Sequence, residues 1–282
     1  LNLKPPLPAP PPCDRWYRSW HVYDNDGSFE GWFDEVPRFF RVGAFSPLAT
    51  LFIVGFFAYV VTSFPTSLAL SSMPPRAFGL WWWLTAASFA WGLLVVYVAS
   101  QTVHLVLFCL SYTGWSWILL TLHAGISASA GLLVTTPIGL DLHRAAALLR
   151  FPVLVGAAVT FSVWNCMLLP LILSTIKPSE KDKFVRFNCG FFMSNVHLIN
   201  FPMALVTTLF AEGGTPFHWV DLWAGFFVLL LYTLTYILIM DRLGLHFYVI
   251  FSPRTHSVVV LYAALVALYY GVYRGMNAHW TL

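Results

Sequence analysis

The chain has 282 residues, of which 59% are hydrophobic and only 10% are charged. Soluble domains carry roughly 25% charged residues, so this composition excludes a disordered chain, a coiled coil, a disulfide scaffold and an ordinary soluble enzyme. The net charge of +3 is too small to indicate a nucleic-acid partner. We therefore expect an all-α fold, a polytopic bundle of transmembrane helices surrounded by membrane lipids.

The first 44 residues differ in composition from the rest of the chain. Six prolines between positions 5 and 12 predict a stiff polyproline start, and nine aromatic residues follow among acidic ones. Disordered tails contain few aromatic residues, so we expect residues 1–44 to form an ordered arm outside the membrane. Two surfaces fit such an arm: the membrane interface, where Trp and Tyr are favoured, and another membrane subunit.

Seven apolar stretches follow, each close to the 20 residues that a hydrocarbon core of about 30 Å requires. They cover residues 47–64, 78–100, 103–134, 151–176, 189–210, 219–240 and 255–273. The third would be about 48 Å long at 1.5 Å per residue, so we expect it to tilt, to break near Gly114 or to begin with an interfacial turn. The chain is thus divided into the arm at 1–44, an extra span and loop at 45–75, a six-helix core at 76–274 and a tail at 275–282.

The Lys and Arg residues are distributed unevenly between the two sides of the membrane. With seven spans, 11 of the 15 lie on the side of the N-terminus and four on the other. Because positively charged loops stay on the cytoplasmic side, we expect the N-terminus to face the cytosol, the matrix or the stroma. The sequence begins with Leu1, as a processed organellar precursor would, so we expect a mitochondrial or plastid inner membrane.

The cysteines and histidines show no metal-binding spacing. The four cysteines form no CxxC pair, so we expect neither a disulfide nor a zinc site. His104, His123 and His197 lie in apolar stretches, and His104 and His197 could crudely satisfy the need of a haem for two facing ligands. No regular spacing repeats, however, and a single buried His hydrogen-bonded to a neighbouring helix is more common. We predict no cofactor and no metal.

Three polar residues, Asn195, His197 and Asn200, lie close together in an otherwise apolar span, where polar groups are costly unless partnered. Thr113 in the third span lies about 15 Å from the positively charged side, and His197 about 12 Å, so we expect both near the midplane. A Thr hydroxyl beside a His can be a nucleophile with its general base, or a structural hydrogen bond between helices. The residues alone leave both interpretations open.

Several short motifs lie within residues 76–273. They are Ser-Gln-Thr-Val-His at 100–104, Leu-Ser-Tyr-Thr-Gly-Trp at 110–115, Asn-Val-His-Leu-Ile-Asn at 195–200, Pro-Phe-His at 216–218, and the tyrosines Tyr232 and Tyr236. This region resembles the rolling stone family of membrane proteins and the related androgen-induced and androgen-dependent TFPI-regulating proteins, which share a six-helix core. Gly114 stands where rolling stone proteins usually have Asn, and residues 1–75 lie outside the family pattern.

Two functions remain open, one implied by the resemblance and one indicated by the N-terminal arm. The androgen-induced proteins hydrolyse fatty acid esters of hydroxy fatty acids with a membrane-embedded Thr nucleophile and a His, which correspond to Thr113 and His197; Asn195 or Asn200 would orient the His or bind the oxyanion. The arm at 1–44 instead favours a non-catalytic accessory subunit of a larger membrane complex, respiratory or photosynthetic. Few charged residues lie in the spans, which argues against an ion-coupled transporter. The sequence does not decide between enzyme and subunit.

Overall fold

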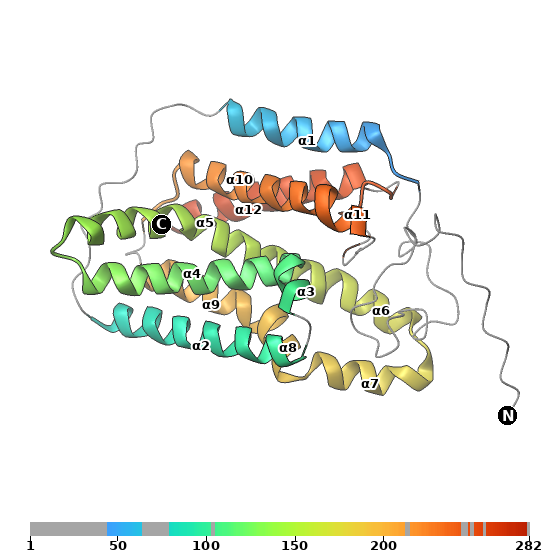
Figure 1. Ribbon diagram of the computed structural model, residues 1–282, viewed down its shortest axis with the longest axis horizontal. Helices are drawn as coiled ribbons and strands as arrows, with labels where there is room; N and C mark the ends of the chain where they lie inside the picture. Colours follow the sequence, from blue (N-terminus) through green and yellow to red (C-terminus); the bar gives the residue numbers. More distant parts are fainter. Residues whose placement is uncertain are drawn as a thin grey trace, which may run out of the picture.

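The structure, a computed structural model, describes residues 44–63, 79–102, 105–211, 215–243, 248, 251–255 and 258–280. In this part of the chain all regular secondary structure is helical (Figure 1), which confirms the all-α prediction. The arm predicted before Ala44, the loop at 64–78 and His104 lie outside the described residues. The α-helices are α1 (Pro47–Thr62), α2 (Leu80–Thr102), α3 (Leu105–Leu110), α4 (Tyr112–Leu132), α5 (Pro137–Phe161), α6 (Leu169–Thr175), α7 (Pro178–Asn188), α8 (Phe191–Ser194), α9 (Asn200–Val206), α10 (Trp219–Thr235), α11 (Asp241–Leu243) and α12 (Val258–Trp280).

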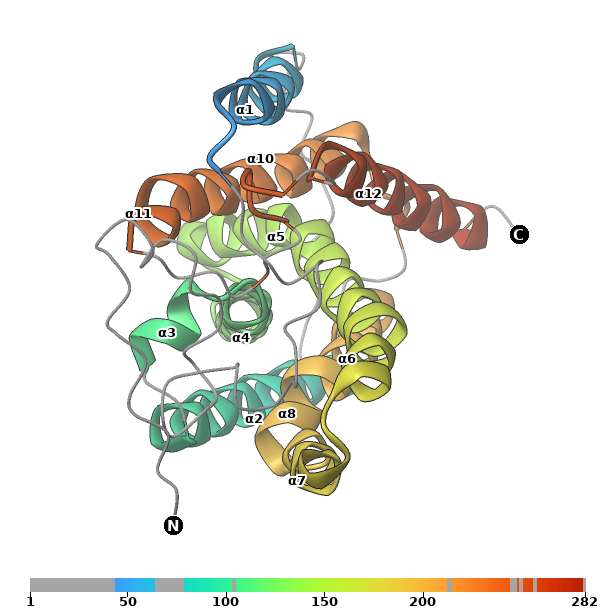
Figure 2. The same cartoon turned by 90° about the vertical axis from the view of Figure 1, so that its right-hand side faces the viewer.

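Helix α4 lies at the centre of the bundle, and Figure 2 shows it end-on with α2, α5 and α10 around it. Twelve of its 21 residues are buried. Glycine permits the close approach of α2, because a Cβ on Gly92 would overlap the side chain of Thr121. The Trp117 indole of α4 also donates a hydrogen bond to the Gly92 carbonyl oxygen at 3.2 Å. The central position of α4 gives its first turn contacts with several other helices.

A break at Ser111 separates α3 from α4, close to Gly114, where a break is one of the three alternatives expected for this long stretch. Ser111 Oγ donates to the Phe108 carbonyl oxygen and accepts from the Gly114 amide, both at 2.9 Å, so one side chain ends α3 and caps α4. A Cβ on Gly114 would lie 1.8 Å from the same Phe108 oxygen. The turn between the two helices therefore requires glycine at position 114.

The span predicted at 151–176 is the second half of a longer helix. α5 begins at Pro137, capped by Thr136, and runs through a π-helical segment, Ser162–Leu168, into α6; the whole helix, Pro137–Thr175, has 39 residues. The helix begins earlier than the predicted span, because Arg150, which the charge count places outside the membrane, is buried and paired within the helix. Residues 177–188, which lie between two predicted spans, form the amphipathic helix α7.

Four helices of the described part are long and apolar enough to cross a membrane: Leu80–Thr102, Pro137–Thr175, Trp219–Met240 and Val258–Ala278. A fifth span results if α7 and Phe191–Leu209, which meet at an angle of 65°, count as one bent segment. α1 has only 16 residues, and the many Ser, Thr, Gly and Trp residues of α4 lower its hydropathy. These long apolar helices fit a multi-pass membrane protein, whereas the predicted count of seven spans is not confirmed.

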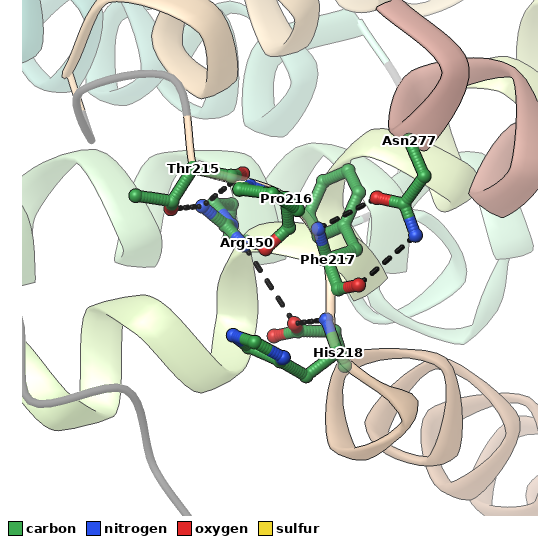
Figure 3. A network of polar contacts seen from close by, with 7 residues as sticks. Arg150, Thr215, Pro216, Phe217, His218 and Asn277 are labelled. Carbon is green, nitrogen blue, oxygen red and sulfur yellow. Dashed lines mark hydrogen bonds and ion pairs between the residues drawn. The ribbon is translucent and has the colours of Figure 1, made fainter. Parts of the chain in front are cut away.

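Buried ion pairs lie near both ends of the helix that begins with α10. Near its start, the Arg150 guanidinium lies 3.6 Å from the Asp221 carboxylate and donates to the hydroxyl and the carbonyl oxygen of Thr215 (Figure 3). After its last apolar turn, Asp241 accepts two hydrogen bonds from Arg254, at 2.7 and 3.0 Å. The two carboxylates are separated by about 30 Å at 1.5 Å per residue, which is the usual thickness of the hydrocarbon core.

The network around Arg150 also ties α12 to the rest of the bundle. The Asn277 side chain accepts a hydrogen bond from the Phe217 amide at 2.7 Å and donates one to its carbonyl oxygen at 3.0 Å (Figure 3). Asp221 accepts from the His218 amide at 2.6 Å, which caps α10. Helices α5, α10 and α12 are thus joined at one end by buried polar contacts.

Helix α1 lies on the outside, against α10 and α12 (Figures 1 and 2). Only Ile53 and Phe57 of α1 are buried. The Trp223 indole of α10 donates a hydrogen bond to the Val61 carbonyl oxygen at 2.9 Å. Large apolar side chains such as Leu48 remain exposed on the outer face of α1, as expected for a surface covered by lipid.

Candidate functional site

Thr113 belongs to the first turn of α4, directly after the break at Ser111. The side chain is buried, with 6% exposure, although the position lies near a helix end. The break positions it there, because α3 turns away and leaves the first turn of α4 facing the interior. The Thr113 hydroxyl is therefore available to residues from other helices.

His197 lies in a second unusual backbone segment, the π-helical turn Asn195–Ile199 between α8 and α9. The segment faces the other π-helical segment, Ser162–Leu168. There Asn165 donates hydrogen bonds to the His197 carbonyl oxygen at 2.7 Å and to the Phe161 carbonyl oxygen at 3.0 Å. Single π-helical turns are rare and occur frequently at functional sites, and here two of them meet at one histidine.

The His197 ring is held on both its face and its edge. Trp164 stacks on the imidazole with ring centroids 4.2 Å apart and an angle of 21° between the planes. At the ring edge, Nε2 lies 3.3 Å from Thr113 Oγ1. The backbone of Met193 lies close to the ring. Nδ1 makes no hydrogen bond to a described residue.

A third residue, Tyr248, completes this polar chain, because its hydroxyl is hydrogen-bonded to Thr113 Oγ1. When Nδ1 of His197 carries the ring proton, Nε2 accepts a hydrogen bond from Thr113, and Tyr248 donates one to Thr113. This directionality is the one that a hydroxyl nucleophile with a histidine base needs. The same two hydrogen bonds also suffice for a structural chain between α4, the His197 segment and Tyr248, which lies between α11 and α12.

Thr113 and His197 line a small cavity of about 30 Å³, which is partly open to the outside of the bundle. Aliphatic and aromatic side chains form most of the wall, among them Val159, Leu229 and Phe251. This space holds about one or two water molecules, whereas typical small-molecule pockets have roughly 300–1,000 Å³. The mainly apolar wall with a few polar groups suits an apolar ligand that carries one polar, reactive group, and the side chains of the wall must move apart to admit it.

The structure brings Thr113 and His197 together but directs Asn195 and Asn200 elsewhere. Asn195 Oδ1 accepts a hydrogen bond from the Trp91 indole at 2.8 Å. Asn200 Nδ2 donates to the Ser116 hydroxyl at 3.1 Å. Neither asparagine lines the cavity, so their predicted orienting or oxyanion roles stay predictions without a contact to Thr113 or to the His197 side chain.

Sequence reasoning missed three residues of this site. Tyr248 lies between two spans, in a stretch that no periodic pattern places, and Trp164 lies in a π-helical segment that local composition does not indicate. Tyr232 appears in the sequence only as one of two tyrosines in a motif. Trp164 and Thr113 contact the His197 ring and Tyr248 contacts Thr113, each from a separate segment, so these residues form a site only in three dimensions.

The described residues contain no group of three or more His, Cys, Asp or Glu side chains arranged to bind a metal ion. His104, the second candidate haem ligand, lies outside the described residues. The Nε2 atom of His197 is occupied by Thr113.

Comparisons of the chain with models of known protein families, with curated proteins and with solved structures found no match. The resemblance to the rolling stone and androgen-induced proteins therefore rests on short motifs and stays a prediction. The contact between Thr113 and His197 is a property of this chain, independent of any relative.

Proposed function

We propose that the protein is an intramembrane lipid-ester hydrolase, with Thr113 as nucleophile and His197 as general base. The supporting observation is the 3.3 Å distance from Thr113 Oγ1 to His197 Nε2 at the wall of an apolar, aromatic cavity. By the motif resemblance, the substrates are fatty acid esters of hydroxy fatty acids. Their acyl chains match the apolar wall, and their ester carbonyl is the group that a hydroxyl nucleophile attacks.

The reaction needs only the residues described. Thr113 Oγ1 bonds to the ester carbonyl carbon while its proton passes to His197 Nε2, and the electron pair of the C=O double bond moves onto the carbonyl oxygen. This pair then returns, the bond to the alkoxy oxygen breaks, and His197 gives its proton to the leaving alcohol. A water molecule repeats both steps on the acyl-Thr113 ester, which releases the fatty acid and restores the hydroxyl.

The test is ester hydrolysis by the purified protein in detergent. We expect wild type to hydrolyse a long-chain ester of a hydroxy fatty acid, and Thr113→Ala and His197→Ala to fall to background. The double variant should be no slower than either single variant, since the two residues act as one unit. Thr160→Val is the matched control, because Thr160 lines the same cavity but donates its hydroxyl to the Gly156 carbonyl oxygen.

One outcome would overturn the hydrolase proposal. If wild type and all variants hydrolyse the ester only at the background rate, the hydrolase proposal is wrong. The remaining hypothesis is then a non-catalytic subunit of a larger membrane complex. In that case the contact between Thr113 and His197 would serve to join helices. Purification of the native protein with stable partner subunits would then be the expected result.

We also propose the finer membrane arrangement expected from the sequence: seven spans, an organellar inner membrane, and an N-terminus on the side rich in Lys and Arg. α1 would be a short span of about 24 Å, because a bilayer can thin locally around a short helix. α3 and α4 would cross as one broken span, which the buried position of α4 supports. Chemical labelling of residues at the two opposite ends of the bundle tests this arrangement directly.

A further inference from the structure

The hydroxyl of Tyr232 is a buried polar group that makes no hydrogen bond to a described residue. Tyr232 lies on α10, its side chain is only 6% exposed, and it lines the same cavity as Thr113 and His197. Buried hydroxyl groups are nearly always hydrogen-bonded, because an unpaired one loses its interactions with water and gains nothing in return. An exception at a cavity wall indicates a donor that a ligand can satisfy.

The other hydroxyl groups around the cavity are already engaged. The Tyr112 hydroxyl pairs with that of Tyr269 at 3.1 Å, and the Tyr262 hydroxyl with that of Thr233 at 3.4 Å. The Tyr248 hydroxyl pairs with Thr113. Tyr232 is therefore the tyrosine of this wall whose hydroxyl makes no hydrogen bond to a described residue.

The ring of Tyr232 is fixed by edge-to-face contacts with two aromatic side chains of α4. Its centroid lies 5.0 Å from that of Tyr112 and 5.5 Å from that of Trp115, at angles of 78° and 73°. Both neighbours flank Thr113 along the chain. The packing thus fixes the position of the Tyr232 ring relative to the first turn of α4, as preorganised donors require.

We propose that the Tyr232 hydroxyl donates a hydrogen bond to the carbonyl oxygen of the bound ester, which makes Tyr232 the oxyanion donor of the site. The inference rests on the proposed hydrolase function. When Thr113 Oγ1 bonds to the carbonyl carbon, the electron pair of the C=O bond moves onto that oxygen, and a fixed donor stabilises the charge. The amides of Asn195 and Asn200 are bonded elsewhere and do not reach the cavity.

Tyr232→Phe tests the proposal, because it removes one hydroxyl and keeps the ring that packs on Tyr112 and Trp115. Loss of a single oxyanion donor lowers kcat by about 10²–10³-fold, and we expect this loss with little change in KM. Tyr269→Phe is the matched control, because it also removes a buried tyrosine hydroxyl but lies outside the cavity wall, and its kcat should stay near that of wild type. A Tyr232→Phe enzyme with wild-type kcat would overturn the proposal.

A binding measurement separates this proposal from the hydrolase function itself. In a Thr113→Ala background, where the ester is not cleaved, an ester is compared with the ether analogue in which CH₂ replaces the carbonyl group. Quenching of Trp fluorescence reports binding, since Trp164 lines the cavity. We expect the protein to prefer the ester, and Tyr232→Phe to abolish that preference.

The two failures are distinguishable. Absence of hydrolysis in wild type overturns the enzymatic function, while the ester preference still decides whether Tyr232 binds a carbonyl oxygen. Equal preference for the ester with and without the Tyr232 hydroxyl overturns the assignment of Tyr232, even where hydrolysis is observed. Thermal unfolding of each variant in detergent verifies that the fold is intact.

Discussion

The indole ring of Trp164 stacks on the imidazole ring of His197, with ring centroids 4.2 Å apart. The two rings come from π-helical segments of different helices, Ser162–Leu168 and Asn195–Ile199. A flat aromatic surface leaves the imidazole little freedom to tilt, and its Nε2 atom then faces Thr113. The stack therefore connects two irregular backbone segments with the orientation of the proposed base.

Replacement of Trp164 should consequently impair catalysis through the orientation of His197. We expect Trp164→Leu to lower kcat by about 10–100-fold, because small displacements of a catalytic group are costly. Trp164→Phe should retain most of the activity, since a ring still covers the imidazole. Asn188→Ala is the control for the hydrogen bond that the Trp164 indole donates to Asn188 Oδ1 at 3.2 Å. Equal kcat in Trp164→Leu and wild type would contradict this role.

Local signals account for the parts of the fold that the sequence predicts well. The predicted span at 219–240 coincides with the apolar helix Trp219–Met240, since the long charge-free stretch at 222–240 is itself a membrane signal. The length of the third apolar stretch predicts a break near Gly114 as one of three alternatives. The expected approach of Thr113 to His197 depends on their similar depth together with the motif resemblance.

The remaining features depend on tertiary contacts that no local pattern contains. Arg150 looks like a loop residue because it is charged, yet it lies inside a helix and pairs with Asp221, far along the chain. Tyr248 reaches Thr113 from a segment between spans. The alignment of Trp164 with His197 requires π-helical turns, whose extra residue shifts the helix face.

Gly114→Ala should destabilise the turn between α3 and α4. The new Cβ would lie 1.8 Å from the Phe108 carbonyl oxygen, so the backbone must move. Forced overpacking typically costs about 1–3 kcal/mol, and thermal unfolding in detergent should show the loss. The shift should also lower kcat, because Thr113 is the adjacent residue. Gly55→Ala on α1 is the matched control, since its Cβ would meet no atom within 4 Å and alanine favours helix.

The buried pair of Arg150 and Asp221 should show strong coupling. Arg150→Leu leaves the Asp221 carboxylate buried beside an apolar side chain, and loss of one partner of such a pair typically costs about 3–5 kcal/mol. Adding Asp221→Asn removes the leftover charge and keeps an acceptor for the His218 amide. We therefore expect the double variant to be more stable than Arg150→Leu alone. Additive losses in a double-mutant cycle would contradict the coupling.

Positions on α5 and α7 should be labelled from opposite sides of a membrane. Asp141 lies near the start of α5 and Lys181 lies on α7, and the two helices occupy opposite ends of the bundle (Figure 1). Between these ends, the carboxylates of Asp221 and Asp241 are separated by about one hydrocarbon thickness.

The measurement uses Asp141→Cys and Lys181→Cys, each in a background in which the four native cysteines are replaced. Sealed vesicles are treated with a membrane-impermeant maleimide before and after permeabilisation. We expect Lys181→Cys to react only from the side rich in Lys and Arg, and Asp141→Cys only from the other side, because an odd number of spans separates the two positions in the proposed arrangement. Labelling of both positions from one side would mean that the two ends of the bundle do not face opposite sides of the membrane. It would also contradict a span between Asp141 and Lys181. Labelling from opposite sides but with the reverse orientation would retain the bundle and overturn only the predicted side of the N-terminus.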